Sequence, residues 1–549
     1  MRRVRLFFFF FVWIFISMAQ TANCYRIYLN NKDNSPYSID NPLEYLSQRA
    51  IDKRTRFNIP ITEQDFPVNP EYKQHILSLE FQMKLLSVSK WMNTMTVYCP
   101  DSSVVDEIER LAFVDSVLPV ASYSFNSKSE RVDSEEWKPI VRNTNSVFEN
   151  EIDYGDGWGQ IAIHNGHRLH EEGFRGDGML IAVLDGGYYG IESCTFYQTL
   201  VDEGRMLGRY VLVPDVAEEV SLWDEVHGTN VISVMAANAN GELVGTAPMA
   251  SYALIHTEWG GSEQLIEEDF WANGAEIADS IGADVINSSL GYRSFPDFPE
   301  ANITYEEIDG RNSIASRCAT ILGEKGVIVC IAAGNDGDKD WYYIGRPADA
   351  FNILCVGACQ TDSVIAEFSS RGYTYDGRVK PDITSMGVST YCYYPNDYLY
   401  TSNGTSLACP VAAGLSACLW QAMPEYSASQ IMQIIRESGH LYHNPNPEYG
   451  YGIPDFYKAY ADHVGVDYYN PLKISVFPNP TADKLQLTNP ERNIRYVRIY
   501  NTSGQLVLQQ PAPANAMIEI SVNNLPKGFY VGLATTTNQQ NASFKFLKN

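Results

Sequence analysis

The sequence predicts an α/β protein built around a doubly wound, mainly parallel sheet, with an α+β region before it and a small all-β sandwich after it. Between about residues 153 and 467, short apolar runs alternate with helical patterns, as in parallel strands covered by helices on both faces. From about Pro471 onward, apolar and polar residues alternate with a period of two, which is typical of half-buried strands.

The bulk composition narrows the class of protein. With 45% hydrophobic and 19% charged residues, the chain is neither mainly disordered nor collagen-like. Its 549 residues allow three or four folding units at about 150 residues per domain. A formal net charge of −26 repels phosphate, which argues against nucleic acid as a partner.

Residues 1–22 have the three parts of a secretory signal peptide. Arginines near the start precede the apolar run Leu6–Met18, and the small residues Ala19 and Ala22 follow it. The run is shorter than the roughly 20 residues of a membrane-spanning helix, although an uncleaved anchor remains the alternative. Export permits disulfides, but the ten cysteines predict no particular pairing and no zinc site.

The N-terminal region, residues 23–150, mixes short strands and helices. Strands are expected at Tyr25–Leu29 and Met92–Tyr98, and helices at Leu43–Lys53 and Val104–Leu111. The polar stretch Asn126–Asn150 that follows is expected to be an exposed linker, which is a preferred site of proteolysis.

The central region predicts several buried strands with helices between them. The expected strands are Met179–Leu184, Asp284–Leu290, Val327–Ala333 and Ile353–Val356, and the clearest helices are Glu263–Ile281 and Ser313–Glu324. Ligands of such sheets bind outside the carboxyl ends of the strands. Polar residues at those ends are therefore candidates for a functional site.

The tail predicts a series of short strands. They are expected at Lys484–Leu487, Arg495–Tyr500, Leu506–Leu508, Ile518–Val522, Phe529–Leu533 and Phe544–Leu547, with a turn at Ser503–Gly504. Alternation within these segments indicates two facing sheets with one apolar side each.

Asp185 and Asn335 each follow a buried strand. Asp185 ends the run Ile181–Leu184 and is followed by two glycines, and Asn335 follows the strand that ends near Ala333. Both are thus expected at the carboxyl edge of the sheet. Taken singly, each has an ordinary alternative, a helix cap for the aspartate and a turn residue for the asparagine.

His227 and Ser406 are each associated with a predicted buried helix. One helix is expected to begin near His227, and another near Ser406, with Pro410 in its first turn. Ser406 would then lie at the positive end of the helix dipole. A structural histidine and a serine N-cap are the alternatives, and His170 and His256 are assigned only structural roles.

These four residues together suit one mechanism of nucleophilic catalysis. A serine needs a base to remove its proton, and the base needs a carboxylate to fix its tautomer. Ser406, His227 and Asp185 supply these groups. Asn335 and the Ser406 N–H would stabilise the oxyanion of a tetrahedral intermediate.

The stretches around these residues resemble the signatures of the subtilase family of serine peptidases. The matching segments are Val183–Gly187, His227–Thr229, Ile286–Gly291, Phe368–Asp382 and Gly404–Pro410, in the order of that family. Three positions depart from the usual pattern. Leu407 replaces methionine, Tyr373 replaces proline, and Ser385–Gly387 replaces Ala-Pro-Gly, which puts loop shape in question rather than the triad.

The resemblance implies a subtilisin-like fold with Asp185, His227 and Ser406 as catalytic triad and Asn335 in the oxyanion hole. It also implies a specificity pocket, with walls at Ser289, Leu290, Gly291, Ala332, Ala333 and Gly334 and a floor at Gly345. Glycine at the floor leaves room for a large apolar side chain before the scissile bond. The opposite charges of Asp336 and Arg346 are expected to cancel at the pocket mouth, so that the apolar walls decide the specificity.

Metals and cofactors are not required by this mechanism. Subtilases often hold structural calcium, and candidate oxygen ligands are Gln160, Asp336, Asp338 and Asp340, although no spacing defines a calcium site.

The flanking regions also resemble known segments. Residues 23–150 stand where secreted subtilases carry an inhibitory, fold-assisting propeptide, and a stable accessory domain is the alternative. The tail resembles the sorting domain of the type IX secretion system, through Val476–Thr481, Ile499–Gln505, Leu525–Tyr530 and Phe546–Lys548. A carbohydrate-binding module is the alternative for the tail.

The sequence therefore predicts a secreted serine endopeptidase that hydrolyses proteins through an acyl-enzyme. Its expected parts are a signal peptide (1–22), propeptide and linker (23–150), catalytic domain (151–467) and sorting domain (471–549). Expected partners are protein or peptide substrates, its own propeptide as inhibitor and the type IX machinery. Its expected location is the medium or the cell surface, reached through the periplasm and outer membrane.

Two other classes of protein remain as alternatives. One is a pseudoprotease that only binds, although all four chemical positions carry competent residue types. The other is an α/β-hydrolase esterase, which would need Gly-x-Ser-x-Gly and the chain order Ser, Asp, His.

Overall fold

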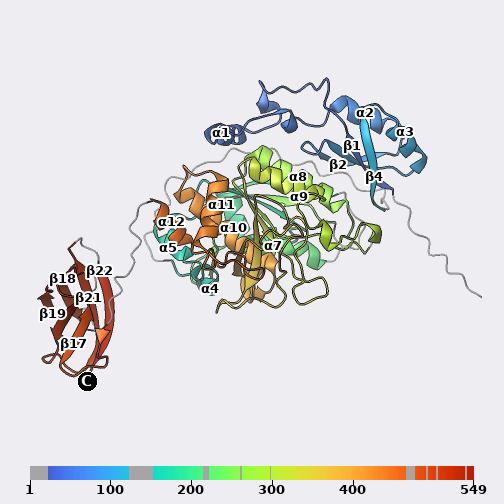
Figure 1. Cartoon of the computed structure of the whole chain (residues 1–549). Helices are drawn as coiled ribbons and strands as arrows, with labels where there is room; N and C mark the ends of the chain where they lie inside the picture. The colour runs from blue at the N-terminus through green and yellow to red at the C-terminus, as the bar shows by residue number, and fades with distance from the viewer. Residues whose placement is uncertain are drawn as a thin grey trace, which may run out of the picture. The chain divides into compact units, whose positions relative to one another are not determined.

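The chain divides into two compact units, Met1–Tyr460 and Ala461–Asn549. The structure is a computed structural model and describes residues 23–122, 152–213, 222–259, 263–296, 298–464, 476–489, 492–501, 505–537 and 541–549 (Figure 1). The predicted signal peptide, the linker Asn126–Asn150 and the turn Ser503–Gly504 lie outside these residues. Within them, no helix combines the length and the apolar character that a membrane span requires.

A parallel seven-stranded sheet forms the centre of the first unit. Its strands are β5 (Leu180–Asp185), β6 (Met206–Val211), β9 (Ser251–His256), β10 (Val285–Ser288), β11 (Ile328–Ala332), β12 (Leu354–Cys359) and β13 (Ile383–Met386). Their spatial order is β13-β12-β11-β10-β5-β9-β6. The order reverses at β5, and in such sheets ligands bind at the carboxyl ends of the strands beside the reversal, here β5 and β10. This topology confirms the predicted doubly wound, mainly parallel sheet.

Helices cover both faces of this sheet (Figure 1). Helices α8 (Glu267–Ile281) and α9 (Ile314–Glu324) pack on alternate strand residues such as Ala182 and Leu184. Helices α7 (Leu222–Ala236) and α10 (Thr405–Ala422) contact the strands as well, and every residue of β5 is buried. Burial on both faces explains why the strands are continuous apolar runs.

The central domain has further α-helices and strands outside this sheet. They are α4 (Trp158–Ala162), α5 (Gly166–Glu171), α6 (Thr195–Asp202), α11 (Ala428–Ser438), α12 (Phe456–Val464), β7 (Asn238–Ala239), β8 (Leu243–Val244), β14 (Thr390–Tyr394) and β15 (Tyr398–Ser402).

Two predicted helix features differ from the structure. Helix α7 begins at Leu222, so His227 lies in its second turn rather than at its start. The prediction relied on the apolar residues after the histidine, and such patterns locate helix ends poorly. Pro410 is the sixth residue of α10 and lies beyond its first turn. Proline is tolerated there because the Ser406 carbonyl, which loses its helical N–H donor, accepts from the Ser289 hydroxyl instead.

The N-terminal region forms a four-stranded antiparallel sheet in the order β2 (Lys84–Ser89), β3 (Thr94–Tyr98), β1 (Cys24–Leu29) and β4 (Val114–Ala121). Its helices are α1 (Gln48–Arg56), α2 (Pro70–Leu77) and α3 (Val105–Glu109). Helix α1 begins later than predicted, after Ser47, whose side chain accepts from the Ala50 N–H as an N-cap. Helix α2 was not predicted from the sequence.

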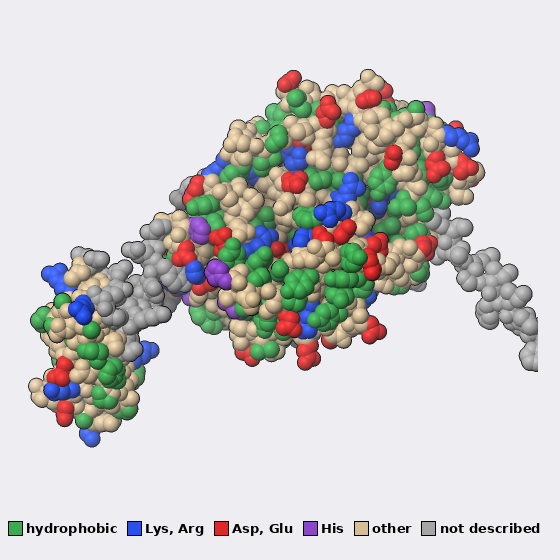
Figure 2. Space-filling model, viewed as in Figure 1, with side chains coloured by type: hydrophobic (Ala, Val, Ile, Leu, Met, Phe, Trp, Pro, Cys, Tyr) green, Lys and Arg blue, Asp and Glu red, His purple; other side chains and the backbone are tan. Residues whose placement is uncertain are grey.

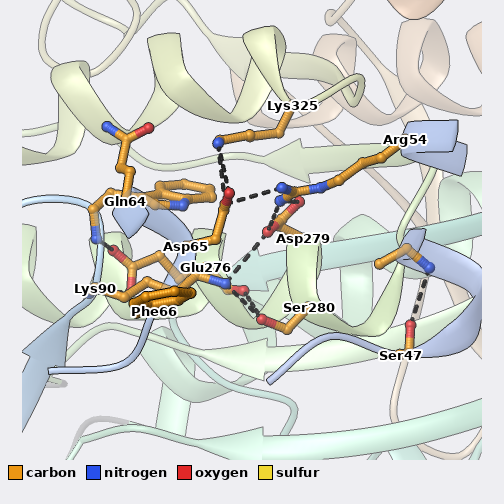
Figure 3. A network of polar contacts seen from close by, with 12 residues as sticks. Ser47, Arg54, Gln64, Asp65, Phe66, Lys90, Glu276, Asp279, Ser280 and Lys325 are labelled. Carbon is orange, nitrogen blue, oxygen red and sulfur yellow. Dashed lines mark hydrogen bonds and ion pairs between the residues drawn. The ribbon is translucent and has the colours of Figure 1, made fainter. Parts of the chain in front are cut away.

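Buried charges join the N-terminal region to the central domain, as Figure 3 shows. Arg54 of α1 pairs with Asp279 of α8 at 2.8 Å and with Asp65 at 3.0 Å. Lys325, which follows α9, pairs with Asp65 at 3.0 Å, and Lys90 approaches Asp279 to 3.3 Å. All five side chains are less than a tenth exposed. The contact therefore depends on charge complementarity in a place that water does not reach.

The second unit is a small all-β sandwich. One sheet contains β16 (Val476–Phe477), β17 (Lys484–Thr488) and β20 (Met517–Ser521), and the other β19 (Leu506–Pro511), β18 (Ile494–Tyr500), β21 (Gly528–Thr536) and β22 (Asn541–Lys548). Alternate residues such as Leu485, Leu487, Val497 and Ile499 are buried and form one apolar cluster. The period-two pattern is thus confirmed in β17, β18 and β20.

Candidate active site

Asp185 and His227 form the first pair of the candidate site. Asp185 is fully buried at the end of β5, and its Oδ1 accepts from His227 Nδ1 at 2.6 Å and from the Gly186 N–H at 2.8 Å. A carboxylate only accepts, so the imidazole carries a proton on Nδ1 and Nε2 is its basic nitrogen. The His227 side chain is 34% exposed, which keeps the ring accessible to a reacting group.

Ser406 is the second residue of α10 and is partly exposed. Gly404, two residues earlier, leaves the space beside it open. A Cβ on Gly404 would lie 2.7 Å from Ser406 Oγ and 3.7 Å from Asn335 Nδ2. One small space is therefore bordered by the serine hydroxyl and by the asparagine amide, and a side chain at residue 404 would fill it.

The Asn335 amide has a defined orientation. Its Oδ1 accepts from the Thr405 N–H at 2.9 Å and from the Thr405 hydroxyl at 3.0 Å. The threonine hydroxyl oxygen in turn accepts from the Gly334 N–H at 3.1 Å. With Oδ1 engaged on one side, Nδ2 is directed to the other, toward the space beside Ser406. Thr405 was not singled out from the sequence, although it lies within the Gly404–Pro410 motif.

The residues predicted as pocket walls come from the loop after β10 and from the end of β11 with the residues that follow it. After β10, Tyr292 pairs through its backbone with Arg346, with N···O distances of 2.7 and 3.0 Å. A Cβ on Gly345 would lie 3.2 Å from the Tyr292 carbonyl oxygen. Ser289, Leu290 and Gly291 therefore lie on a loop that runs beside Gly345, and Ala332, Ala333 and Gly334 lead directly into Asn335.

The charges of Arg346 and Asp336 were expected to cancel at the pocket mouth, but in the structure each residue has other charged partners. Arg346 is only 4% exposed and faces Glu268 and Glu307 at 3.7 and 3.5 Å. Asp336 pairs with Arg293 at 2.8 Å and with Lys339 at 3.1 Å. Arg346 thus lies inside the domain, and the charge of Asp336 is met by neighbouring cations.

The other histidines considered have structural surroundings. His170 is buried, and its ring nitrogens lie 3.0 Å from the Tyr154 hydroxyl and 3.1 Å from the Thr246 carbonyl. Burial lowers the pKa of His170 to about 3, so it stays neutral. His256 is the register partner of Asp185 on β9, and burial likewise lowers its pKa.

Two of the candidate calcium ligands, Gln160 and Asp336, have protein partners. Gln160 is buried, and its Oε1 accepts from the Tyr391 N–H at 2.7 Å, so this oxygen is already engaged. Asp336 is paired with two cations, and Asp338 lies beside it in the same loop. Among the described residues, no group of three or more His, Cys, Asp or Glu could hold a metal ion.

The geometry as a whole supplies the groups of an acyl-transfer site. A carboxylate orients an imidazole, a serine hydroxyl borders an open space, and an amide donor faces that space. Asp185 ends β5 and Asn335 follows β11, whereas His227 and Ser406 come from helices α7 and α10.

Three family models match consecutive parts of the chain. The Subtilase family matches residues 176–452, which is slightly more than half of the chain. The Peptidase S8 propeptide domain of Bacteroidota matches residues 24–136. The Secretion system C-terminal sorting domain matches residues 475–549, at the position predicted for the type IX sorting tail.

Curated relatives agree with these matches. Serine protease AprX of Bacillus subtilis (strain 168) is 27% identical over 320 residues, covering 53% of this chain and 66% of the relative. Subtilisin DY of Bacillus licheniformis is 34% identical over 211 residues, covering 37% and 67%. The chain thus spans about two thirds of the length of these two relatives.

Subtilisin Savinase of Lederbergia lenta is 31% identical over 286 residues, covering 51% of this chain and 90% of the relative. The solved structure of the self-cleaved protease domain of PatA covers 52% of this chain and 97% of its own length, at 22% identity and a TM-score of 0.40.

Proposed function

This chain belongs to the subtilase family, and from that premise we propose that it is a secreted serine endopeptidase acting through an acyl-enzyme on Ser406. The observation that carries the proposal is the His227–Asp185 pair at 2.6 Å, together with the space that Ser406 and Asn335 share. On the face seen in Figure 2, basic side chains are scattered among acidic ones, so this face has no basic stripe for a nucleic acid.

The proposed reaction begins with proton transfer from Ser406 to His227 Nε2. The serine oxygen attacks the peptide carbonyl carbon, and the buried Asp185 carboxylate stabilises the imidazolium. Asn335 Nδ2 and the Ser406 N–H donate to the oxyanion. His227 then gives its proton to the leaving amine, and water attacks the resulting ester by the same route in reverse.

The test is Ser406→Ala in the full chain, with Ser429→Ala as a matched control on an exposed helix position. We expect Ser406→Ala to lose peptidase turnover and covalent labelling by a fluorophosphonate, because both need an activated serine hydroxyl. The precursor should also remain uncut if maturation is autocatalytic. Turnover or labelling at the level of the wild type in Ser406→Ala would refute the assignment of the nucleophile.

In this proposal, Gly345 forms the floor of a pocket that takes a large apolar residue before the scissile bond. Ala332 and Ala333 are apolar, and Gly345 carries no side chain. Since Arg346 is buried, the apolar walls dominate the pocket. Gly345→Val should shift preference from Phe, Leu, Met or Tyr toward Ala in a peptide library, whereas an unchanged profile would show that this loop is not the floor.

The flanking regions suit a precursor that is matured during export. The chain carries a subtilase propeptide and a type IX sorting domain, which indicates secretion or surface attachment. In this proposal the propeptide inhibits the site until it is removed, and the tail engages the secretion machinery. Deleting residues 471–549 should leave active enzyme in the periplasm, and its appearance in the medium would contradict the sorting role.

A further inference from the structure

Pro410 leaves one carbonyl of α10 without its helical donor. In an α-helix the N–H of residue i donates to the carbonyl of residue i−4, and proline has no N–H. Pro410 lies inside α10, four residues after Ser406. The carbonyl deprived of its donor is therefore that of the proposed nucleophile itself.

Ser289 supplies a donor to this carbonyl. Its hydroxyl lies 2.8 Å from the Ser406 carbonyl oxygen and donates to it. The side-chain amide of Asn287 donates to the Ser289 oxygen at 3.0 Å, which directs the hydroxyl proton toward Ser406. Asn287 is fully buried on β10, and Ser289 is 8% exposed, so both groups are held by packing.

We propose that Ser289 is a positioning residue for the nucleophile, whose hydroxyl replaces the helical donor that Pro410 removes. Through this bond the end of β10, which lies next to β5 and Asp185, holds the backbone of residue 406 in place. The same residue carries the hydroxyl that attacks and the N–H that faces the oxyanion. This role rests on the proposed function and adds to the place of Ser289 in the pocket wall.

A positioning role and a wall role predict different kinetics. A misplaced nucleophile lowers kcat for every substrate alike, because misplacement by about 1 Å can cost on the order of a hundredfold. A damaged wall instead changes KM according to the side chain before the scissile bond. We therefore expect Ser289→Ala to lower kcat about tenfold to a hundredfold, uniformly across a peptide panel.

The test compares Ser289→Ala, Ser289→Thr and the double variant Ser289→Ala with Pro410→Ala. Threonine keeps the hydroxyl and should retain most of kcat. Pro410→Ala returns an N–H opposite the Ser406 carbonyl, so the double variant should recover part of the lost rate. If Ser289→Ala does not fold, Ser289→Cys, which is of similar size and a far weaker donor, takes its place.

The readouts are kcat and KM over the panel, the rate of Ser406 labelling by a fluorophosphonate, and hydrogen exchange in the first turn of α10. Faster exchange in Ser289→Ala, reversed in the double variant, supports the proposal even if the enzyme turns over no peptide. A wild-type protein that is neither labelled nor active would instead refute the proposed function. An unchanged kcat, a loss confined to KM, or no recovery in the double variant would overturn the role of Ser289.

Discussion

In the sequence, the propeptide and the sorting tail flank the catalytic domain. Each has an apolar cluster of its own residues, yet their charged residues are arranged in contrasting ways. In the propeptide, Arg26, Arg54 and Lys90 are buried and pair with carboxylates of α8. In the tail, the Lys484–Glu519 pair lies on the surface, with both side chains more than half exposed. The apolar cluster of the tail is made entirely of its own residues.

This difference indicates how each segment is stabilised. A buried cation without its partner is costly, so the folded propeptide depends on the carboxylates of the catalytic domain. An exposed ion pair contributes little, and the tail depends on its own core. The propeptide is built as a ligand of the enzyme, and the tail as a separate domain.

Arg54→Met should give the largest effect. The arginine is 1% exposed and pairs with both Asp65 and Asp279, so its loss leaves buried carboxylates undercompensated. We expect propeptide docking to weaken by about 3–5 kcal/mol. The measurement is denaturant unfolding of the Ser406→Ala precursor, monitored in the propeptide. Arg56→Met, at an exposed position of the same helix, is the control, and an equal loss in the two variants would contradict this interpretation.

Ile499→Ala tests the tail. Ile499 is fully buried in the sandwich core, and such truncations cost about 2–5 kcal/mol. The tail should therefore unfold at lower denaturant, while the unfolding midpoint and peptidase activity of the catalytic domain stay unchanged. A parallel loss of stability in the catalytic domain would show that the tail is not self-contained.

Acidification should affect propeptide docking more than the tail. Burial alone would raise the pKa of Asp65 and Asp279. The cations Arg54 and Lys325 nevertheless hold the pKa of Asp65 below its usual value, and Lys90 and Arg54 do the same for Asp279. A carboxyl group whose pKa is lowered in the docked state stabilises docking at pH values above the ordinary carboxyl pKa near 4. This stabilisation is lost as pH falls through the lowered pKa.

Glu276 acts in the opposite direction. Its pKa is raised by burial despite Lys90 and the Ser89 hydroxyl, so its contribution is greatest in acid and declines as pH rises through the raised value. The loss expected from Asp65 and Asp279 is therefore confined to pH below about 4, and protonation of Glu276 partly offsets it there. Precursor unfolding measured from neutral pH to about pH 3 checks this. Asp279→Asn should flatten the acidic fall, and an unchanged profile would exclude Asp279 as its source.

Lys484→Ala should give the smallest effect. The side chain pairs with Glu519 at 2.7 Å on the surface of the tail, where water and salt screen the charges. We expect the unfolding midpoint of the tail to stay within experimental error at ordinary ionic strength. A clear loss of stability would mean that surface charges hold this sandwich together after all.

Much of the candidate site was predictable because catalytic motifs are local. Asp185 and Asn335 were expected at strand ends from the apolar runs before them. Asp185 does end β5, and Asn335 follows shortly after β11, which ends at Ala332. The role of Thr405 could not be read in this way, because it depends on which atom of Asn335 faces the threonine. The start of α7 was missed as well, since a helix end is defined by backbone hydrogen bonds rather than by side-chain pattern.

The sequence by itself determined the strand and helix periodicities, the parallel sheet, the sandwich tail and the residue types of the site, because each is encoded within a short stretch of chain. Only the tertiary structure decided which distant residues meet. Arg54 lies 225 positions before Asp279, and Ser289 lies 117 positions before Ser406. Contacts at such separations depend on how strands order in the sheet and helices pack on it, and no local pattern of residues records that order.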